Sequence, residues 1–185
     1  DHDRHIEYLI KAFGDHRYLR IDNRPMFLIY NPKAIPNLPA VLARWRMKCE
    51  HAGVGSPLFV CFETFGFLDT DPSQFGCEGS AEFLPHGIER YAPRFFNEEP
   101  FIPQNFVVNY DELVEGHLRA ERPAWPHYRC IVPNWDNTPR AGMRGLVFHG
   151  ATPELFRAHL REAIERVRGH APDHRRAAVD RVHRR

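Results

Sequence analysis

Residues 37–65 read NLPAVLARWRMKCEHAGVGSPLFVCFETF, and this stretch decides the fold class. Its first part, residues 37–52, places apolar side chains at helical spacing, and Gly53 suits the C-terminal end of a helix. Its second part, residues 57–65, is an apolar run with the length of a buried strand. A helix followed closely by a buried strand is typical of α/β proteins, in which helices cover a parallel sheet.

The same alternation continues on both sides of this stretch. Further helices are predicted over 4–13 and 110–121, and further strands over 26–31, 80–84 and 128–133, with Asp22-Asn23 as a turn. The order favours a doubly wound sheet or a (β/α)8 barrel. Four or five β/α units in 185 residues are fewer than a full barrel needs. We therefore expect a partial (β/α)8 TIM-type barrel.

The last helix is marked by its first residues. Thr152 can cap it, Pro153 suits its first position, and Glu154 is favourable at the positive end of the helix dipole. Gly169 is expected to end it. The predicted buried stripe consists of Leu155, Phe156, Leu160, Ile164 and Val167.

Composition excludes several functions. A net charge of +1 gives no broad basic face, so no nucleic-acid partner is expected, and no apolar run is long enough to span a membrane. Phosphate-binding glycine motifs and a G-x-S-x-G elbow are absent from the sequence. No metal or cofactor is expected, because no compact His/carboxylate pair is present. Four irregularly spaced cysteines, with Cys61 and Cys130 in apolar runs, favour buried thiols and a cytoplasmic location.

Polar and aromatic side chains gather where the predicted strands end, which is where parallel α/β folds bind ligands. Carboxylates, an amide, an indole and imidazoles together suit a carbohydrate, whose hydroxyls hydrogen-bond and whose C–H face packs on an aromatic ring. The predicted substrate-binding residues are Tyr30, Glu63, Glu82, His86, Trp135, Asp136, Asn137, Arg140 and His149.

Each of these residues also has a structural interpretation. Residues 136–139, DNTP, suit a turn, because Asp and Asn bond to the local backbone. Trp135 suits the core, Tyr30 suits a strand-end anchor, and Glu82 suits a solvent-facing strand position. No catalytic residue is assigned, and Glu63 and Glu82 are the candidates.

Four segments resemble the WbsX-like glycosyltransferase family, which is related to glycoside hydrolase family 99. They read HIEYLIKAFGDHRYLRIDNRPMFLIYNP (5–32), DPSQFGCEGSAEFLPHG (71–87), CIVPNWDNTPR (130–140) and FHGATPELF (148–156). The resemblance runs from residue 1 to about 168. It implies a (β/α)8 barrel that acts on glycans in polysaccharide or lipopolysaccharide biosynthesis.

The resemblance also implies a catalytic glutamate pair in a motif that follows the last helix. Residues 171–185 form a basic tail without such a motif, so residues 1–170 are expected to be an incomplete barrel domain. The leading hypothesis is a truncated enzyme fragment that is inactive by itself. The alternatives are a non-catalytic glycan-binding module, or a half-barrel completed by a partner chain at its open sheet edges.

Overall fold

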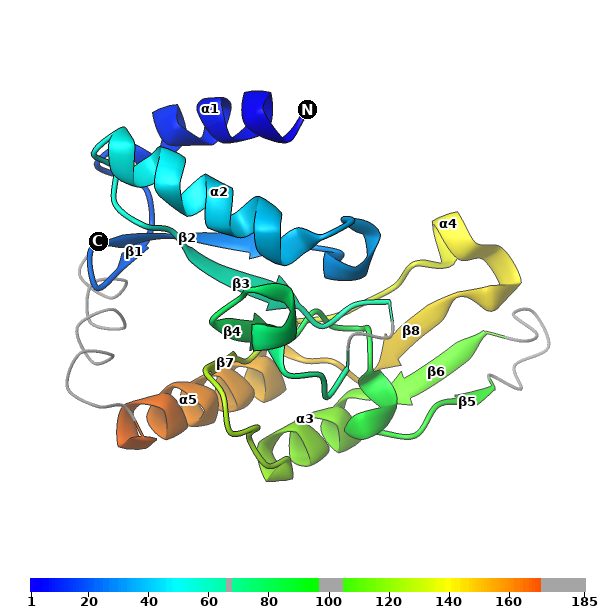
Figure 1. The fold of residues 1–185 in the computed structure, drawn as a ribbon. Coiled ribbons are helices and arrows are strands. Elements are labelled where there is room, and N and C mark those ends of the chain that lie inside the picture. Colours follow the sequence, from blue (N-terminus) through cyan, green and yellow to red (C-terminus); the bar gives the residue numbers. More distant parts are fainter. Residues whose placement is uncertain (66–67, 97–104, 171–185) are drawn as a thin grey trace. The chain divides into compact units, whose positions relative to one another are not determined.

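The computed structural model describes residues 1–65, 68–96 and 105–170, so the expected basic tail at 171–185 lies outside the described residues. The chain divides into two compact units (Figure 1). Unit 1 comprises Asp1–Phe83 and Pro123–Tyr128, and unit 2 comprises Leu84–Arg122 and the chain from Arg129 onward. The expected single barrel domain is thus organised as two units.

Unit 1 contains a five-stranded sheet in the order β1-β2-β3-β4-β7. The strands are β1 (Arg20–Ile21), β2 (Arg24–Ile29), β3 (Leu58–Phe62), β4 (Gly79–Ala81) and β7 (His127–Tyr128). The β1–β2 pair is antiparallel and the other pairs are parallel. Asp22 and Asn23 join β1 to β2 with φ angles of 49° and 61°, as a type I′ turn requires, so the predicted turn is confirmed.

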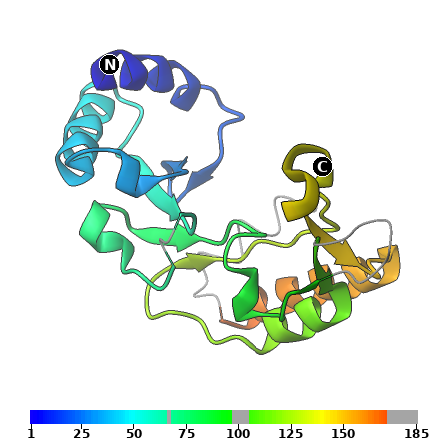
Figure 2. The ribbon, with the colours of Figure 1, turned by 90° about the vertical axis from the view of Figure 1, so that its right-hand side faces the viewer.

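Helices α1 (His2–Phe13) and α2 (Leu38–His51) lie side by side on one face of this sheet (Figures 1 and 2). Both helices were predicted from their apolar spacing. Their buried faces meet the odd-numbered residues of β2 and β3, including Ile29, Phe59 and Cys61. The short 3-10 helices Pro32–Ala34 and Pro72–Phe75 complete the connections of unit 1.

Unit 2 contains a three-stranded sheet in the order β5-β6-β8. The strands are β5 (Phe95–Phe96), β6 (Phe106–Asn109) and β8 (Leu146–His149), with β6 and β8 parallel. The helices are α3 (Tyr110–Arg119), α4 (Thr138–Ala141) and α5 (Pro153–His170), together with 3-10 helices at Ile88–Arg90 and Gly142–Arg144. The α/β character of both units, with mostly parallel strands in unit 1, confirms the predicted α/β class and is compatible with part of a barrel.

The predicted strand at 128–133 is wrong over most of its length. Only His127 and Tyr128 pair, because their neighbour β4 has three residues and offers no longer ladder. Downstream, the Val132 carbonyl instead accepts a 2.7 Å hydrogen bond from the Tyr110 hydroxyl in the core of unit 2. Conversely, β6 and β8 were not predicted, because four-residue strands carry too little periodicity.

The start of α5 is as predicted. Its first residue is Pro153, and the Thr152 hydroxyl accepts from the Leu155 amide at 3.2 Å. The predicted stripe is wrong at Leu160, which is 38% exposed, whereas the neighbouring His159 is fully buried. His159 lies one turn after Leu155, and its ring nitrogen lies 2.8 Å from that of His117 on α3. Packing against α3 therefore places a histidine in the stripe.

Candidate functional site

The carboxyl ends of β2, β3 and β4 meet at one edge of the unit 1 sheet, because these strands are parallel. Tyr30 directly follows β2, Glu63 follows β3 and Glu82 follows β4. The Thr64 hydroxyl donates to the Tyr30 carbonyl and links two of these ends. The structure thus brings these three predicted residues to the same edge.

The two faces of the sheet carry different chemistry at this edge. Cys61, Ser80 and His127 are in register, so their side chains share one face, and Glu63 and Glu82 follow two positions later on that face. Phe62 lies between Cys61 and Glu63 and points to the opposite face. The predicted sugar site is therefore divided by the sheet, with aromatic rings on one face and carboxylates on the other.

Four rings form what we call the aromatic cluster: Tyr30, Phe62, Phe65 and Phe83. The Tyr30 ring meets the Phe65 and Phe83 rings edge to face, with centroids 5.4 Å and 5.1 Å apart, and Phe83 meets Phe62 at 5.0 Å. Tyr30 is 47% exposed and Phe65 is 54% exposed. Phe65 also has a φ of 46°, which is uncommon for a bulky residue. The cluster offers solvent two large rings that its own packing holds in place.

The other face carries a buried polar network of Glu63, Ser80, Trp125 and His127. The Trp125 indole donates to the Ser80 hydroxyl at 2.9 Å, and this hydroxyl donates to Oε1 of Glu63 at 2.9 Å. Nε2 of His127 lies 3.1 Å from the same carboxylate oxygen. Because a carboxylate only accepts, His127 donates through Nε2. Glu63 is therefore held by donors from two neighbouring strands.

Glu82 lies beside this network, with Oε1 at 4.0 Å from Nε2 of His127. Glu63, Glu82 and the His127 side chain are each more than nine-tenths buried. Within the described part of the chain, no group hydrogen-bonds to Nδ1 of His127. Sequence reasoning missed His127, because a two-residue strand after the AWP segment gives no periodic signal. Neighbouring residues of a strand point to opposite faces, so the sequence order of Phe62 and Glu63 could have predicted that the ring and the carboxylate lie on different faces of the sheet.

Unit 2 holds the remaining six predicted residues. Oδ1 of Asp136 accepts from the Thr138 amide at 2.8 Å, and bonding to the Thr138 backbone and side chain lowers the pKa of Asp136. Oδ1 of Asn137 accepts from the Leu146 amide at 2.7 Å, at the start of β8. Asp136 thus makes the local bond that the turn interpretation requires, whereas Asn137 bonds to a strand nine residues further along the chain.

The other four predicted residues of unit 2 differ in how far they are exposed to solvent. Trp135 is half-buried and packs against the unit 2 core. Arg140 is exposed on α4, His149 is exposed at the end of β8, and His86 is half-buried. Their roles as sugar contacts stay predictions.

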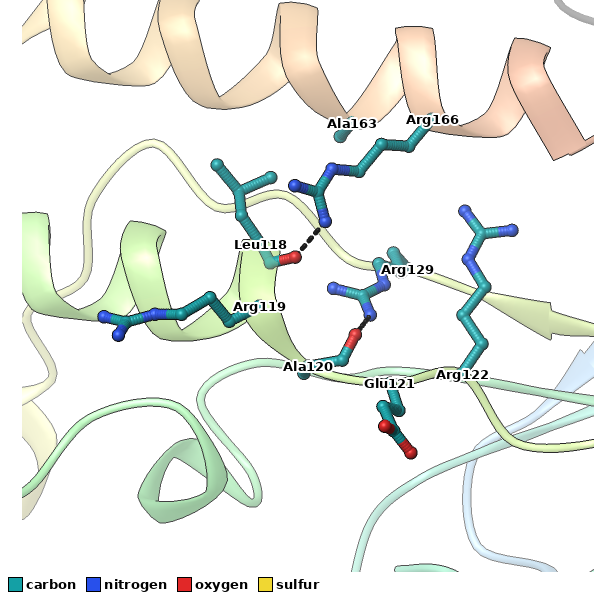
Figure 3. Close-up of a pocket in the computed structure, with 8 residues that line it drawn as sticks. All are labelled: Leu118, Arg119, Ala120, Glu121, Arg122, Arg129, Ala163 and Arg166. Carbon is teal, nitrogen blue, oxygen red and sulfur yellow. Dashed lines mark hydrogen bonds between the residues drawn. The ribbon is translucent and has the colours of Figure 1, made fainter.

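Unit 2 also contains a cavity of about 450 Å³ between the end of α3 and α5 (Figure 3). It is lined by none of the nine predicted residues. Its lining residues are Leu118, Arg119, Ala120, Glu121, Arg122, Arg129, Ala163 and Arg166. Over residues 1–65, 68–96 and 105–170, no cluster of three or more His, Cys, Asp or Glu side chains could hold a metal ion.

A family model described as Glycosyltransferase WbsX matches residues 1–180. The chain belongs to this family. The resemblance of the four quoted segments to this family is thereby confirmed. No helix in the part of this WbsX-family chain that the structure describes is long and apolar enough to cross a membrane.

Two curated relatives are similar to this WbsX-family chain. Both are named uncharacterized protein WxcX, and they come from Xanthomonas campestris pv. campestris strains ATCC 33913 and B100. Each is 26% identical over 170 residues, which is 90% of this chain and 24% of the relative. The chain thus spans about a quarter of the length of the curated relatives it matches. No solved structure matches it.

Proposed function

We propose that this chain is the sugar-binding part of a protein that transfers or hydrolyses glycosidic bonds in polysaccharide or lipopolysaccharide metabolism. The aromatic cluster of unit 1 is the observation that supports this proposal. The family name supports the substrate class, and the position at the carboxyl edge of a parallel sheet supports the site. The TIM-type barrel remains our interpretation of the architecture.

The aromatic cluster suits a sugar ring better than a purely apolar ligand. Tyr30 and Phe65 each expose about half of their surface, and their ring planes stand at 88° to one another. A sugar packs its C–H face on an aromatic ring and leaves its hydroxyls to polar groups. Tyrosine adds a hydroxyl to the same surface, which is how aromatic residues serve ligands that are partly polar.

Glu63 and Glu82 hold the edge together in this proposal rather than act on the glycosidic bond. Glycoside chemistry generally requires two carboxylates on either side of the reacting bond. Oε1 of Glu63 instead accepts from Ser80 and His127, and it lies on the face opposite to the aromatic cluster. The catalytic pair is therefore not assigned to these two residues, and we expect sugar binding by this chain without turnover.

Truncating the exposed rings should weaken sugar binding. We expect Tyr30→Ala and Phe65→Ala each to reduce the affinity for the best-bound sugar by about tenfold, because each change removes half of the exposed stacking surface. The measurement is saturation-transfer NMR with a panel of methyl glycosides of common hexoses and deoxyhexoses. The same panel should release no reducing sugar.

Two exposed rings elsewhere serve as matched controls. Tyr8 on α1 is 71% exposed and Phe95 on β5 is 42% exposed, and neither belongs to the aromatic cluster. Tyr8→Ala and Phe95→Ala should bind sugar as the parent chain does. Equal losses in all four variants would contradict the assignment of the site. Reducing-sugar release that disappears in Glu82→Gln would contradict the absence of turnover.

A further inference from the structure

The cavity in unit 2 has a wall that is unusually rich in arginine. Four of its eight lining residues are arginines and one is a glutamate, so the wall carries an excess of positive charge. The arginines come from the end of α3, from the segments that follow it and from α5. Like charges repel one another in a shared cavity, so an anion there would be favoured.

Hydrogen bonds to the backbone hold two of these guanidinium groups in place. Arg129 donates to the carbonyls of His117 and Ala120, and Arg166 donates to the carbonyl of Leu118. The Glu162 carboxylate also accepts from Nε of Arg166 at 2.9 Å. These three carbonyls at the negative end of α3 therefore already have donors. An incoming anion would meet fixed guanidinium groups instead of bare carbonyl oxygens.

The remaining arginines differ in direction. In Figure 3, Arg129 and Arg166 lie together at the end of α3 and Arg122 rises beside them, whereas Arg119 and Glu121 point away. Arg119 also pairs with Glu115 at 2.8 Å. Of the five N–H donors of Arg129, the contacts identified among the described residues use two. The side chains that could contact a ligand in the cavity are therefore those of Arg122, Arg129 and Arg166.

We propose that this cavity binds a phosphoryl anion, with Arg122, Arg129 and Arg166 as its contacts. Guanidinium groups match phosphate oxygens through paired N–H donors, which makes arginine suited to phosphate recognition. A volume of about 450 Å³ exceeds what one phosphate fills, so the cavity has room for a diphosphate. This site goes beyond the sugar-binding proposal and does not depend on it, because all of its residues belong to unit 2.

Calorimetric titration of the whole chain with inorganic pyrophosphate tests the proposal. We expect saturable binding that weakens as salt rises, and Arg122→Gln should weaken it by about tenfold, since one charged contact is lost. Arg129 and Arg166 are left unchanged in this test, because they donate hydrogen bonds to carbonyls at the end of α3. Arg157→Gln is the matched control: this exposed α5 arginine approaches Glu154 at 4.0 Å and does not line the cavity.

Further titrations distinguish the sources of the phosphoryl group. Inorganic phosphate that binds as well as pyrophosphate would identify a single-phosphate site, and tighter binding of a nucleoside diphosphate such as UDP would identify a nucleotide site. Both results support the proposal. It would be overturned if pyrophosphate gave no saturable binding at low salt, if UDP bound where pyrophosphate did not, or if Arg122→Gln and Arg157→Gln had equal effects. Sugar binding in unit 1 is measured separately, so either proposal can fail without the other.

Discussion

Replacing Glu63 with alanine should lower the free energy of unfolding by about 2–6 kcal/mol, because it leaves two buried hydrogen-bond donors without their acceptor, at about 1–3 kcal/mol each. The Glu63 carboxylate accepts hydrogen bonds from the Ser80 hydroxyl and the His127 ring, and both donors are buried. After the substitution, these two donors would lose their acceptor in a site that water does not reach. Urea unfolding followed by circular dichroism measures the change.

An exposed glutamate of the same unit provides the control. Glu7 is 64% exposed and lies 3.3 Å from Lys48, so Glu7→Ala should cost less than about 1 kcal/mol. A double-mutant cycle of Glu63→Ala with His127→Ala should show a coupling energy of about 0.5–3 kcal/mol, because the two side chains contact one another. If the two losses simply added, the network that the structure shows would not exist in solution.

Replacing Gly116 with alanine should destabilise the chain, although alanine is the better helix former. Gly116 lies inside α3, where the exchange would ordinarily add about 1 kcal/mol to helix stability. Here the added methyl group would overlap the backbone carbonyl of Tyr91, which cannot move away as a flexible side chain could. We expect a net loss of about 2 kcal/mol or more and a melting temperature lower by roughly 4–8 °C.

Gly14 is the matched control for this substitution. It ends α1 with an ordinary helical φ of −74°, and an added methyl group there would meet its nearest atoms at 3.6 Å. Gly14→Ala should therefore leave the melting temperature unchanged or raise it slightly. A Gly116→Ala chain that melts with or above Gly14→Ala would show that Tyr91 does not pack against α3 as described.

The long elements could be predicted from the sequence because their patterns repeat. Helices α1, α2, α3 and α5 span at least ten residues each, and β3 is a dense apolar run. The short strands could not be predicted, because β6, β7 and β8 owe their existence to neighbours that are distant in the chain. The burial of His159 could not be predicted for the same reason, since it depends on the ring of His117, which is distant in the chain.

The sequence predicted which side chains follow the ends of the unit 1 strands, but not which face of the sheet each of them lies on. Tyr30, Glu63 and Glu82 do meet at one edge, as parallel strands require. The prediction treated these residues as one surface. Side chains alternate along each strand, however, so Phe62 and Glu63 lie on opposite faces of the sheet. His127 could be assigned only once β7 was paired with β4, because register and not sequence distance brings it to Glu63.

The central claim is that the aromatic cluster of unit 1 binds a sugar ring. The most direct measurement is an NMR titration of the chain, with ¹³C-labelled phenylalanine rings, against the methyl glycoside panel. Tyr30 and Phe65 are the exposed rings of the cluster, and the Phe83 ring contacts that of Tyr30. The account predicts saturable shifts of the Phe65 and Phe83 ring signals that require about tenfold more sugar in Tyr30→Ala and are unchanged in Tyr8→Ala. If no sugar moved these signals while the chain stayed folded, the aromatic cluster would not be the binding site.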